Sequence, residues 1–150
     1  MIIGYTTGVY DLFHIGHLNL LRRAKEHCDE LIVGVATDEL TESLKNISPI
    51  VPFSERCEII EALKCVDRVV PYDVADRIAA WKKHQFTIMF KGDDWKGTPQ
   101  GAALEKQMAV VGVKIVYFPY TESTSSTRLR QYLDWVLQDN GSAVLGNAQK

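Results

Sequence analysis

Residues 1–36 read MIIGYTTGVYDLFHIGHLNLLRRAKEHCDELIVGVA, and the spacing of their apolar side chains changes twice along this stretch. Residues 1–7 have the composition of a strand, and residues 31–36 form a nearly continuous apolar run, typical of a strand buried on both faces. Between these two segments, helical spacing relates His17, Leu20, Leu21, Ala24 and Cys28. A strand, a helix and a buried strand in succession predict a β-α-β unit with parallel strands and a right-handed crossover.

The alternation of strand and helix patterns continues along most of the chain. Further strands are expected at 66–71, 86–90 and 113–118. The helices are marked by apolar repeats at Ile59, Ile60 and Leu63, at Val74, Ile78 and Trp81, at Leu104, Met108 and Val111, and at Leu129, Tyr132, Leu133, Val136 and Leu137. We therefore expect an α/β fold, a Rossmann-like open parallel sheet of about five strands with helices on both faces.

Two segments lack this periodicity. Residues 37–45 read as a polar segment, followed by a loop with two prolines, after which Ser54 is expected to cap the next helix. Residues 139–150 are polar and rich in small side chains, so we expect one domain over residues 1–138 and a polar C-terminal tail.

Composition excludes several classes of protein. The chain has 150 residues, of which 46% are hydrophobic and 24% charged, as in ordinary globular domains. The net charge of −2 argues against a nucleic-acid surface, and the absence of a long apolar run argues against a membrane span. We expect a cytoplasmic protein. Three cysteines without a CxxC pair predict neither a disulfide framework nor a protein metal site.

The loop after the first strand contains two histidines that flank a glycine, His14-Ile15-Gly16-His17. They stand where the first helix begins, and a helix N-terminus has unpaired N–H groups that suit a phosphate. Side chains three residues apart share a helix face, and a glycine between them permits close approach to the backbone. The alternative interpretation is a pair of polar residues near a helix cap.

This loop resembles the HxGH signature of the nucleotidyltransferase superfamily, and Gly8-Val9-Tyr10-Asp11 is similar to the GxFD element that precedes it in that superfamily. The resemblance covers roughly residues 1 to 137. Further matching segments are Ser54-Glu55-Arg56, Val66-Asp67, Lys91-Gly92-Asp93-Asp94-Trp95 and Glu122-Ser123-Thr124-Ser125-Ser126-Thr127.

Within the superfamily, the segment at 92–95 looks most like the cytidylyltransferases of glycerol 3-phosphate, phosphocholine and phosphoethanolamine. A carboxylate such as Asp94 can accept a hydrogen bond from the exocyclic amine of cytosine, whereas the keto group of uracil would be repelled. The alternative for this segment is an acidic turn beside a core tryptophan.

Several polar residues are candidates for phosphate binding. Ser125, Ser126 and Thr127 precede the last helix and could donate to a triphosphate, although they could equally form an ordinary N-cap. Arg128 follows them with a plausible phosphate role. In relatives, lysines in the region of Lys45 approach the phosphates, and the segment at 45–53 has the position of a lid. The guanidinium of Arg56 suits phosphate oxygens, with a structural ion pair as the alternative.

The resemblance implies transfer of CMP from CTP to a phosphorylated alcohol similar to glycerol 3-phosphate, with Mg²⁺ accompanying the triphosphate, in a homodimer. The implied catalytic residues are His14, His17, Lys45 and Arg56. Asp11 is expected to orient the loop. The implied nucleotide-binding residues are Gly8, Val9, Tyr10, Asp11, Gly16, Lys91, Gly92, Asp94, Trp95, Ser125, Ser126 and Thr127.

Departures from the pattern leave the acceptor open. Glycerol-3-phosphate enzymes carry a threonine in place of Val9, an arginine in place of Tyr120 and Gly-Ile in place of Ser123-Thr124. Two alternatives therefore stay open beside the main hypothesis: an adenylyltransferase of the same fold that uses ATP with a sugar phosphate or coenzyme precursor, and a nucleotide sensor without turnover.

Overall fold

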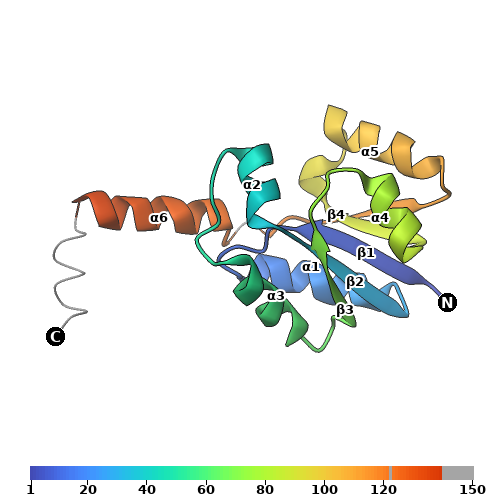
Figure 1. Cartoon of the computed structure of the whole chain (residues 1–150), viewed down its shortest axis with the longest axis horizontal. Coiled ribbons are helices and arrows are strands. Elements are labelled where there is room, and N and C mark those ends of the chain that lie inside the picture. The colour runs from blue at the N-terminus through green and yellow to red at the C-terminus, as the bar shows by residue number, and fades with distance from the viewer. Residues whose placement is uncertain (122, 140–150) are drawn as a thin grey trace.

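Five parallel strands form the centre of the structure, in the order β3-β2-β1-β4-β5 (Figure 1). They are β1 (Ile3–Gly8), β2 (Glu30–Ala36), β3 (Arg68–Tyr72), β4 (Ile88–Gly92) and β5 (Lys114–Phe118). Each neighbouring pair is parallel. The computed structural model describes residues 1–121 and 123–139, so Glu122 and residues 140–150 of the tail expected at 139–150 lie outside the described residues, whereas Asp139 belongs to a helix. The Rossmann-like sheet predicted from the sequence is confirmed.

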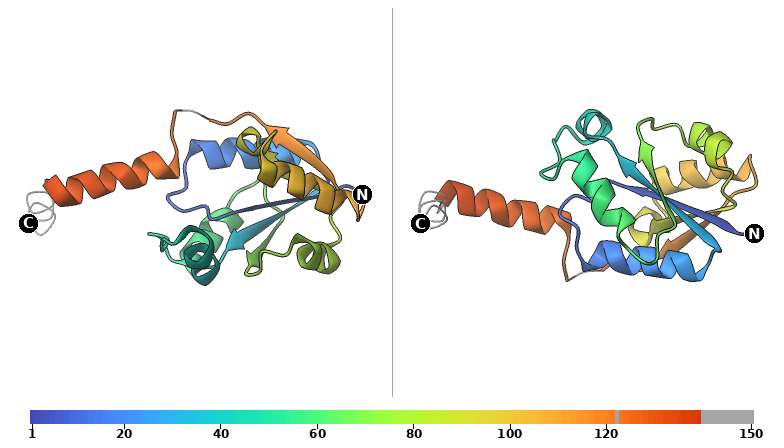
Figure 2. Two further views of the ribbon diagram at one scale, coloured as in Figure 1. Left: turned by 90° about the horizontal axis from the view of Figure 1, so that it is seen from above. Right: turned by 60° about the horizontal axis from the view of Figure 1, so that its bottom comes forward.

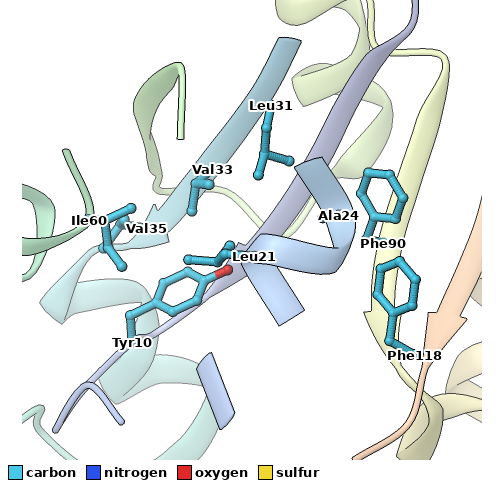
Figure 3. Close-up of a cluster of buried hydrophobic side chains, with 9 residues drawn as sticks. All are labelled: Tyr10, Leu21, Ala24, Leu31, Val33, Val35, Ile60, Phe90 and Phe118. Carbon is cyan, nitrogen blue, oxygen red and sulfur yellow. The ribbon is translucent and has the colours of Figure 1, made fainter. Parts of the chain in front are cut away.

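Helices join the strands and cover both faces of the sheet. They are α1 (Ile15–Glu26), α2 (Asp38–Lys45), α3 (Phe53–Glu61), α4 (Arg77–His84), α5 (Pro99–Ala109) and α6 (Ser126–Asp139), and a single 3₁₀ turn, η1 (Asp93–Trp95), follows β4. On one face, α1 and α3 pack on a cluster that includes Leu21, Ile60 and Phe90 (Figure 3). On the other face, α4 and α5 pack around Tyr5 and Met89.

Three local expectations were wrong. The polar segment at 37–45 contains helix α2, whose Thr37 cap accepts a hydrogen bond from the Leu40 amide at 3.1 Å. Only a short apolar side of this helix is buried, which is why its periodicity is weak. Ser54 does not cap α3, because the helix begins one residue earlier and its N-cap is Pro52. Val74 precedes α4 and is exposed.

The order of the strands places the carboxyl ends of β1 and β4, which are distant in the sequence, side by side. The chain builds β1, β2 and β3 in one direction across the sheet and then returns to add β4 and β5 on the other side of β1. Ligands of such sheets bind at this switch point, beyond the carboxyl ends of the strands. The loops after β1 and β4 both open there. Helix α6 begins near the same end and extends away from the sheet (Figures 1 and 2).

Candidate active site

The loop after β1 adopts an unusual backbone that Asp11 stabilises. Tyr10 and Leu12, on either side of Asp11, have φ angles of 56° and 51°, in the left-handed region. Such residues cost about 1–3 kcal/mol each unless their surroundings fix them. The buried Asp11 carboxylate accepts hydrogen bonds from the amides of Ile50 at 2.8 Å and Val51 at 2.9 Å. Asp11 therefore holds the loop in place, as the sequence predicted.

The two histidines form a reciprocal cap at the start of α1. The Nδ1 atom of His14 accepts a hydrogen bond from the Gly16 amide at 3.0 Å, and the His14 amide donates to Nδ1 of His17 at 3.3 Å. The two rings are 3.9 Å apart between centroids. Because each Nδ1 is an acceptor, the proton of each neutral imidazole is on Nε2. Both side chains line a cavity at the switch point of the sheet.

Both imidazoles are held in the neutral form. Burial, reinforced by the neighbouring His14, lowers the pKa of His17 to about 3, and Asp11 opposes this shift. Burial also lowers the pKa of His14. Near neutral pH the pair is thus a set of two uncharged N–H donors at a helix N-terminus, which can bind phosphate oxygens without exchanging a proton with them.

Gly16 leaves room for the His14 ring. A Cβ atom at this position would lie 2.8 Å from Cε1 and 3.0 Å from Nδ1 of His14. The space above this glycine is therefore taken up by an imidazole, where the sequence predicted the close approach of a ligand. Any larger residue would displace the His14 ring from its capping position.

Helix α6 brings hydroxyl groups and an arginine to the same cavity. Ser125 Oγ accepts from the Arg128 amide at 3.1 Å, and Ser126 Oγ donates to the Asp11 carbonyl at 2.7 Å. One turn later, Arg130 forms a salt bridge with the Asp11 carboxylate. Arg128, which sequence reasoning singled out, is exposed and does not line the cavity, whereas Arg130 does. Helical spacing was the missed signal, since Arg130 lies four residues after Ser126.

The end of β4 supplies a buried lysine and an aromatic ring. Lys91 is 9% exposed, and its Nζ atom lies 3.4 Å from Thr7 Oγ1 and 4.4 Å from the centroid of the Trp95 ring. A Cβ atom at Gly92 would lie 2.6 Å from Oδ1 of Asp94, so a larger residue there would move that carboxylate. Asp94 and Trp95 both line the cavity.

Arg56 lies away from the cavity and is completely buried. Its guanidinium donates to the carbonyls of Val9 at 2.6 Å and Ala36 at 2.8 Å, and it forms a salt bridge with Asp38 at 2.6 Å. These partners, together with the Val51 carbonyl, use four of its five N–H groups within the protein. The structure therefore places Arg56 in the structural role that was the alternative for this residue, and not beside a phosphate.

A cavity of about 410 Å³ at the switch point collects the other predicted residues. Every predicted site residue except Arg56 and Arg128 lines it. Lys45 reaches it from the last turn of α2. Sequence reasoning missed several further lining residues, among them Thr6, Thr7, Thr41, Thr121, Thr124 and Arg130. Thr6 and Thr7 end the first strand, where the inward and outward faces of a buried strand cannot be told apart by pattern.

Among residues 1–121 and 123–139, no group of three or more His, Cys, Asp or Glu side chains is arranged to hold a metal ion. In the same part of the chain, no helix is long and apolar enough to cross a membrane.

A parallel α/β sheet with a switch-point cavity lined by neutral imidazoles, hydroxyl groups and lysines defines a protein that binds a phosphorylated ligand. Comparison with known families makes this class more specific. The model of the cytidylyltransferase-like family matches residues 5–132, and the chain belongs to that family. It is a nucleotidyltransferase by this membership and by its curated relatives.

Relatives are similar over most of this chain. The glycerol-3-phosphate cytidylyltransferase of Bacillus spizizenii is 33% identical over 127 residues, 84% of this chain and 92% of the relative. The bifunctional protein HldE of Geobacter metallireducens is 29% identical over 140 residues, 93% of this chain, which spans only 28% of HldE. A lipopolysaccharide core biosynthesis protein from Thermoplasma volcanium has a similar structure, with a TM-score of 0.69 and 28% identity over 83% of this chain and 99% of that protein.

Proposed function

We propose that this protein transfers CMP from CTP to a phosphorylated alcohol similar to glycerol 3-phosphate, forming a CDP-alcohol and pyrophosphate. The observation that carries the proposal is the histidine pair: two neutral imidazoles with both Nδ1 atoms engaged by backbone amides, facing a cavity at the switch point. The similarity to the Bacillus spizizenii enzyme, named for glycerol 3-phosphate, supports this acceptor class.

The chemistry needs positioning and charge stabilisation more than covalent participation by the protein. An oxygen of the acceptor phosphate attacks the α-phosphorus of CTP. The bond from that phosphorus to the bridging oxygen of the β-phosphate breaks, and pyrophosphate leaves with the electron pair. In this scheme His14 and His17 donate hydrogen bonds to oxygens of the α- and β-phosphates. Because the pKa values of both rings are lowered, neither ring gains or loses a proton near pH 7.

Mg²⁺ enters this reaction as part of the substrate, bound to the triphosphate. The donor set of the cavity agrees with that role. The two carboxylates among its described lining residues are Asp11, which is engaged by Arg130 and by three amides, and Asp94. Phosphate oxygens, not a cluster of protein carboxylates, would therefore supply most of the ligands of the ion.

Base selection is assigned to Asp94. Its carboxylate stands at the edge of the cavity next to Trp95 and can accept from the amine of cytosine. We expect CTP to be preferred over UTP and ATP, and Asp94→Ala to reduce this preference by about 10- to 100-fold while changing turnover at saturating nucleotide little. Competition between nucleotides in a pyrophosphate-release assay measures the preference. Asp134→Ala, at an exposed carboxylate of α6, is the matched control.

The proposal is tested by pyrophosphate release from CTP with a panel of phosphorylated polyols and amino alcohols. Release that depends on both substrates supports it. Equal use of ATP would favour the adenylyltransferase alternative, and nucleotide binding without release from any acceptor would favour the sensor.

A homodimer and a cytoplasmic location belong to the same proposal. In the single chain, α6 presents apolar side chains to solvent, with Tyr132 61% and Leu137 59% exposed, and a second copy would cover them. Sedimentation of the purified protein tests the dimer. No nucleic acid is required as a partner, in keeping with the net charge of −2.

A further inference from the structure

The ammonium group of Lys91 is buried and has no carboxylate partner in the part of the chain that the structure describes. Lys91 is 9% exposed, and its one hydrogen-bond partner among the described residues is the Thr7 hydroxyl, at 3.4 Å. Within residues 1–121 and 123–139, no carboxylate oxygen lies within 4.0 Å of its Nζ atom. The Trp95 ring, 4.4 Å away, provides the remaining favourable contact. A buried charge left in this state is costly unless a ligand pairs with it.

The groups that face Lys91 add to this effect. Burial, and then Arg77 on α4, lower the pKa of Lys91 to about 8, and Lys45 on α2 shifts it in the same direction. Asp94 on η1 opposes them. Lys91, Arg77 and Lys45 are thus three cations with one exposed carboxylate, Asp94, to balance them. The net positive charge of this region favours a bound anion.

Lys91 stands on the opposite side of the sheet from the histidines. Side chains two residues apart in a strand share a face, so Thr7 and Lys91 continue the face of Tyr5 and Met89, which α4 and α5 cover. His14 and His17 begin α1, which packs on the other face. The cavity therefore has groups that can bind an anion on both sides of the switch point, Lys91 on one side and the histidine pair on the other.

We propose that Lys91 binds the phosphate of the acceptor, whereas the histidine pair and the hydroxyl groups before α6 bind the triphosphate. This inference rests on the proposed function. Nucleotidyl transfer brings two anions together, and their repulsion must be reduced before the acceptor oxygen reaches the α-phosphorus. The sequence assigned Lys91 to the nucleotide, and the position of its ammonium beside Thr7 instead suits the second anion.

The same geometry selects among acceptors. The ammonium of Lys91 already lies over the Trp95 ring, and the Arg77 guanidinium carbon lies 5.6 Å from the centroid of that ring. A quaternary or primary ammonium on the acceptor would find this aromatic surface taken and would be repelled by two cations. Phosphorylated alcohols with an uncharged remainder are therefore favoured over phosphocholine and phosphoethanolamine.

The test separates the Michaelis constants of the two substrates. We expect Lys91→Met to raise KM for glycerol 3-phosphate by about 10- to 100-fold, the effect of losing a charge-assisted hydrogen bond, with KM for CTP little changed. Lys91→Arg keeps the charge and should restore much of the affinity. Lys96→Met, at an exposed lysine outside the cavity, is the matched control and should behave as wild type.

A pH profile gives a readout that a merely structural role would not change. In the wild type, kcat/KM for glycerol 3-phosphate should fall above a pH of about 8, because Lys91 then loses its proton before the acceptor binds. In Lys91→Arg this loss should move to much higher pH, since a guanidinium stays protonated. A fall at the same pH in both proteins would overturn the assignment.

Further outcomes decide between the two proposals. If Lys91→Met raises KM for CTP and leaves KM for glycerol 3-phosphate unchanged, Lys91 serves the nucleotide and the inference is wrong. If the wild type releases no pyrophosphate with any acceptor, the proposed function fails, and calorimetric titration with glycerol 3-phosphate then tests Lys91 alone. Binding that Lys91→Met abolishes supports the site, whereas equal binding by both proteins, or none by the wild type, overturns it. Equal use of phosphocholine overturns the selection among acceptors.

Discussion

Arg56 and Lys91 are two buried cations whose surroundings differ. Arg56 is 0% exposed and is satisfied by the carbonyls of Val9, Ala36 and Val51 and by the Asp38 carboxylate. Lys91 is 9% exposed and has a single hydroxyl partner among the described residues. From the sequence, Arg56 was predicted to be catalytic through the substrate phosphates and Lys91 to bind the nucleotide, and only Lys91 lines the cavity.

The difference shows how to distinguish a structural cation from one that binds a ligand. The guanidinium of Arg56 joins the loop after β1, the end of β2 and the segment before α3, and it is fully buried outside the cavity, where a substrate does not reach it. Lys91 lies at the cavity, and no carboxylate among the described residues pairs with its charge. A buried charge is stable only if an opposite charge or hydrogen-bond partners surround it. Arg56 has such partners within the protein, and in our proposal the acceptor phosphate is the partner of Lys91.

The largest expected effect is on the structural cation. Arg56→Met should reduce the free energy of unfolding by about 3–5 kcal/mol, because it leaves the carbonyls of Val9, Ala36 and Val51 and the Asp38 carboxylate without their donor. Thermal and urea unfolding measure this loss. Arg22→Met, at an exposed arginine of α1, is the control and should unfold as wild type. A variant at Arg56 that keeps full stability and loses activity would instead restore the phosphate-binding role.

The next largest effect is expected for His17, which lines the cavity as a hydrogen-bond donor. His17→Ala should lower kcat by about 10²- to 10³-fold, as expected for the loss of one preorganised donor. Steady-state pyrophosphate release measures this change, and unfolding experiments should show a loss of only about 1 kcal/mol, since the variant also loses the acceptor of the His14 amide at the helix cap. His27→Ala, at the C-terminal end of the same helix, is the matched control.

The pH dependence of this histidine has a defined sign. Since the pKa of His17 is lowered to about 3, the folded protein keeps the neutral ring throughout the range from pH 5 to 8. No loss of kcat attributable to His17 should therefore occur in that range. An acidic limb near pH 6 that disappears in His17→Ala would show that the ring is protonated during turnover and would contradict the neutral-donor scheme.

A smaller effect is expected at Lys45, the exposed lysine at the end of α2. Lys45→Ala should lower the rate by about 10-fold or more through the loss of a charge-assisted contact with the phosphates, and it should leave stability nearly unchanged. Lys82→Ala, in the last turn of α4, is the control. Proteolysis with and without Mg·CTP tests whether the segment at 45–53 closes over the substrates. Equal cleavage in both conditions would make it an ordinary surface loop.

Much of the fold and most of the cavity could be predicted because they depend on local patterns. Strand and helix periodicities alternate regularly, and parallel β-α-β units bring the loops after β1 and β4 to one edge of the sheet. The histidines and Asp94 stand on those two loops. Helix α2 was missed because it buries little apolar surface beyond Leu40.

The roles of Arg56 and Arg130 could not be assigned in this way, because they depend on contacts distant in the sequence. The partners of Arg56 come from residues 5 to 47 positions away, and Arg130 bonds Asp11 across 119 positions. Any arginine near a phosphate motif has the chemistry to bind phosphate, and only the surroundings of its guanidinium decide whether it is free to do so. The same holds for Lys91, whose missing carboxylate is invisible in the sequence.

The smallest expected effect is on the stability of Lys91→Met, and it tests the comparison most directly. The pKa of Lys91 in the folded protein lies near 8, below the ordinary lysine value of 10.5. Between these two pH values the unfolded chain keeps a proton that the folded protein has released, so the free energy of unfolding of the wild type should rise with pH there. Lys91→Met lacks this titration, so at pH 7 it should be at least as stable as the wild type, and any difference should vanish toward pH 10. Unfolding curves at pH 7, 8 and 10 measure both trends. A clear loss of stability at pH 7 would mean that Lys91, like Arg56, is a structural cation, and the distinction between the two residues would fail.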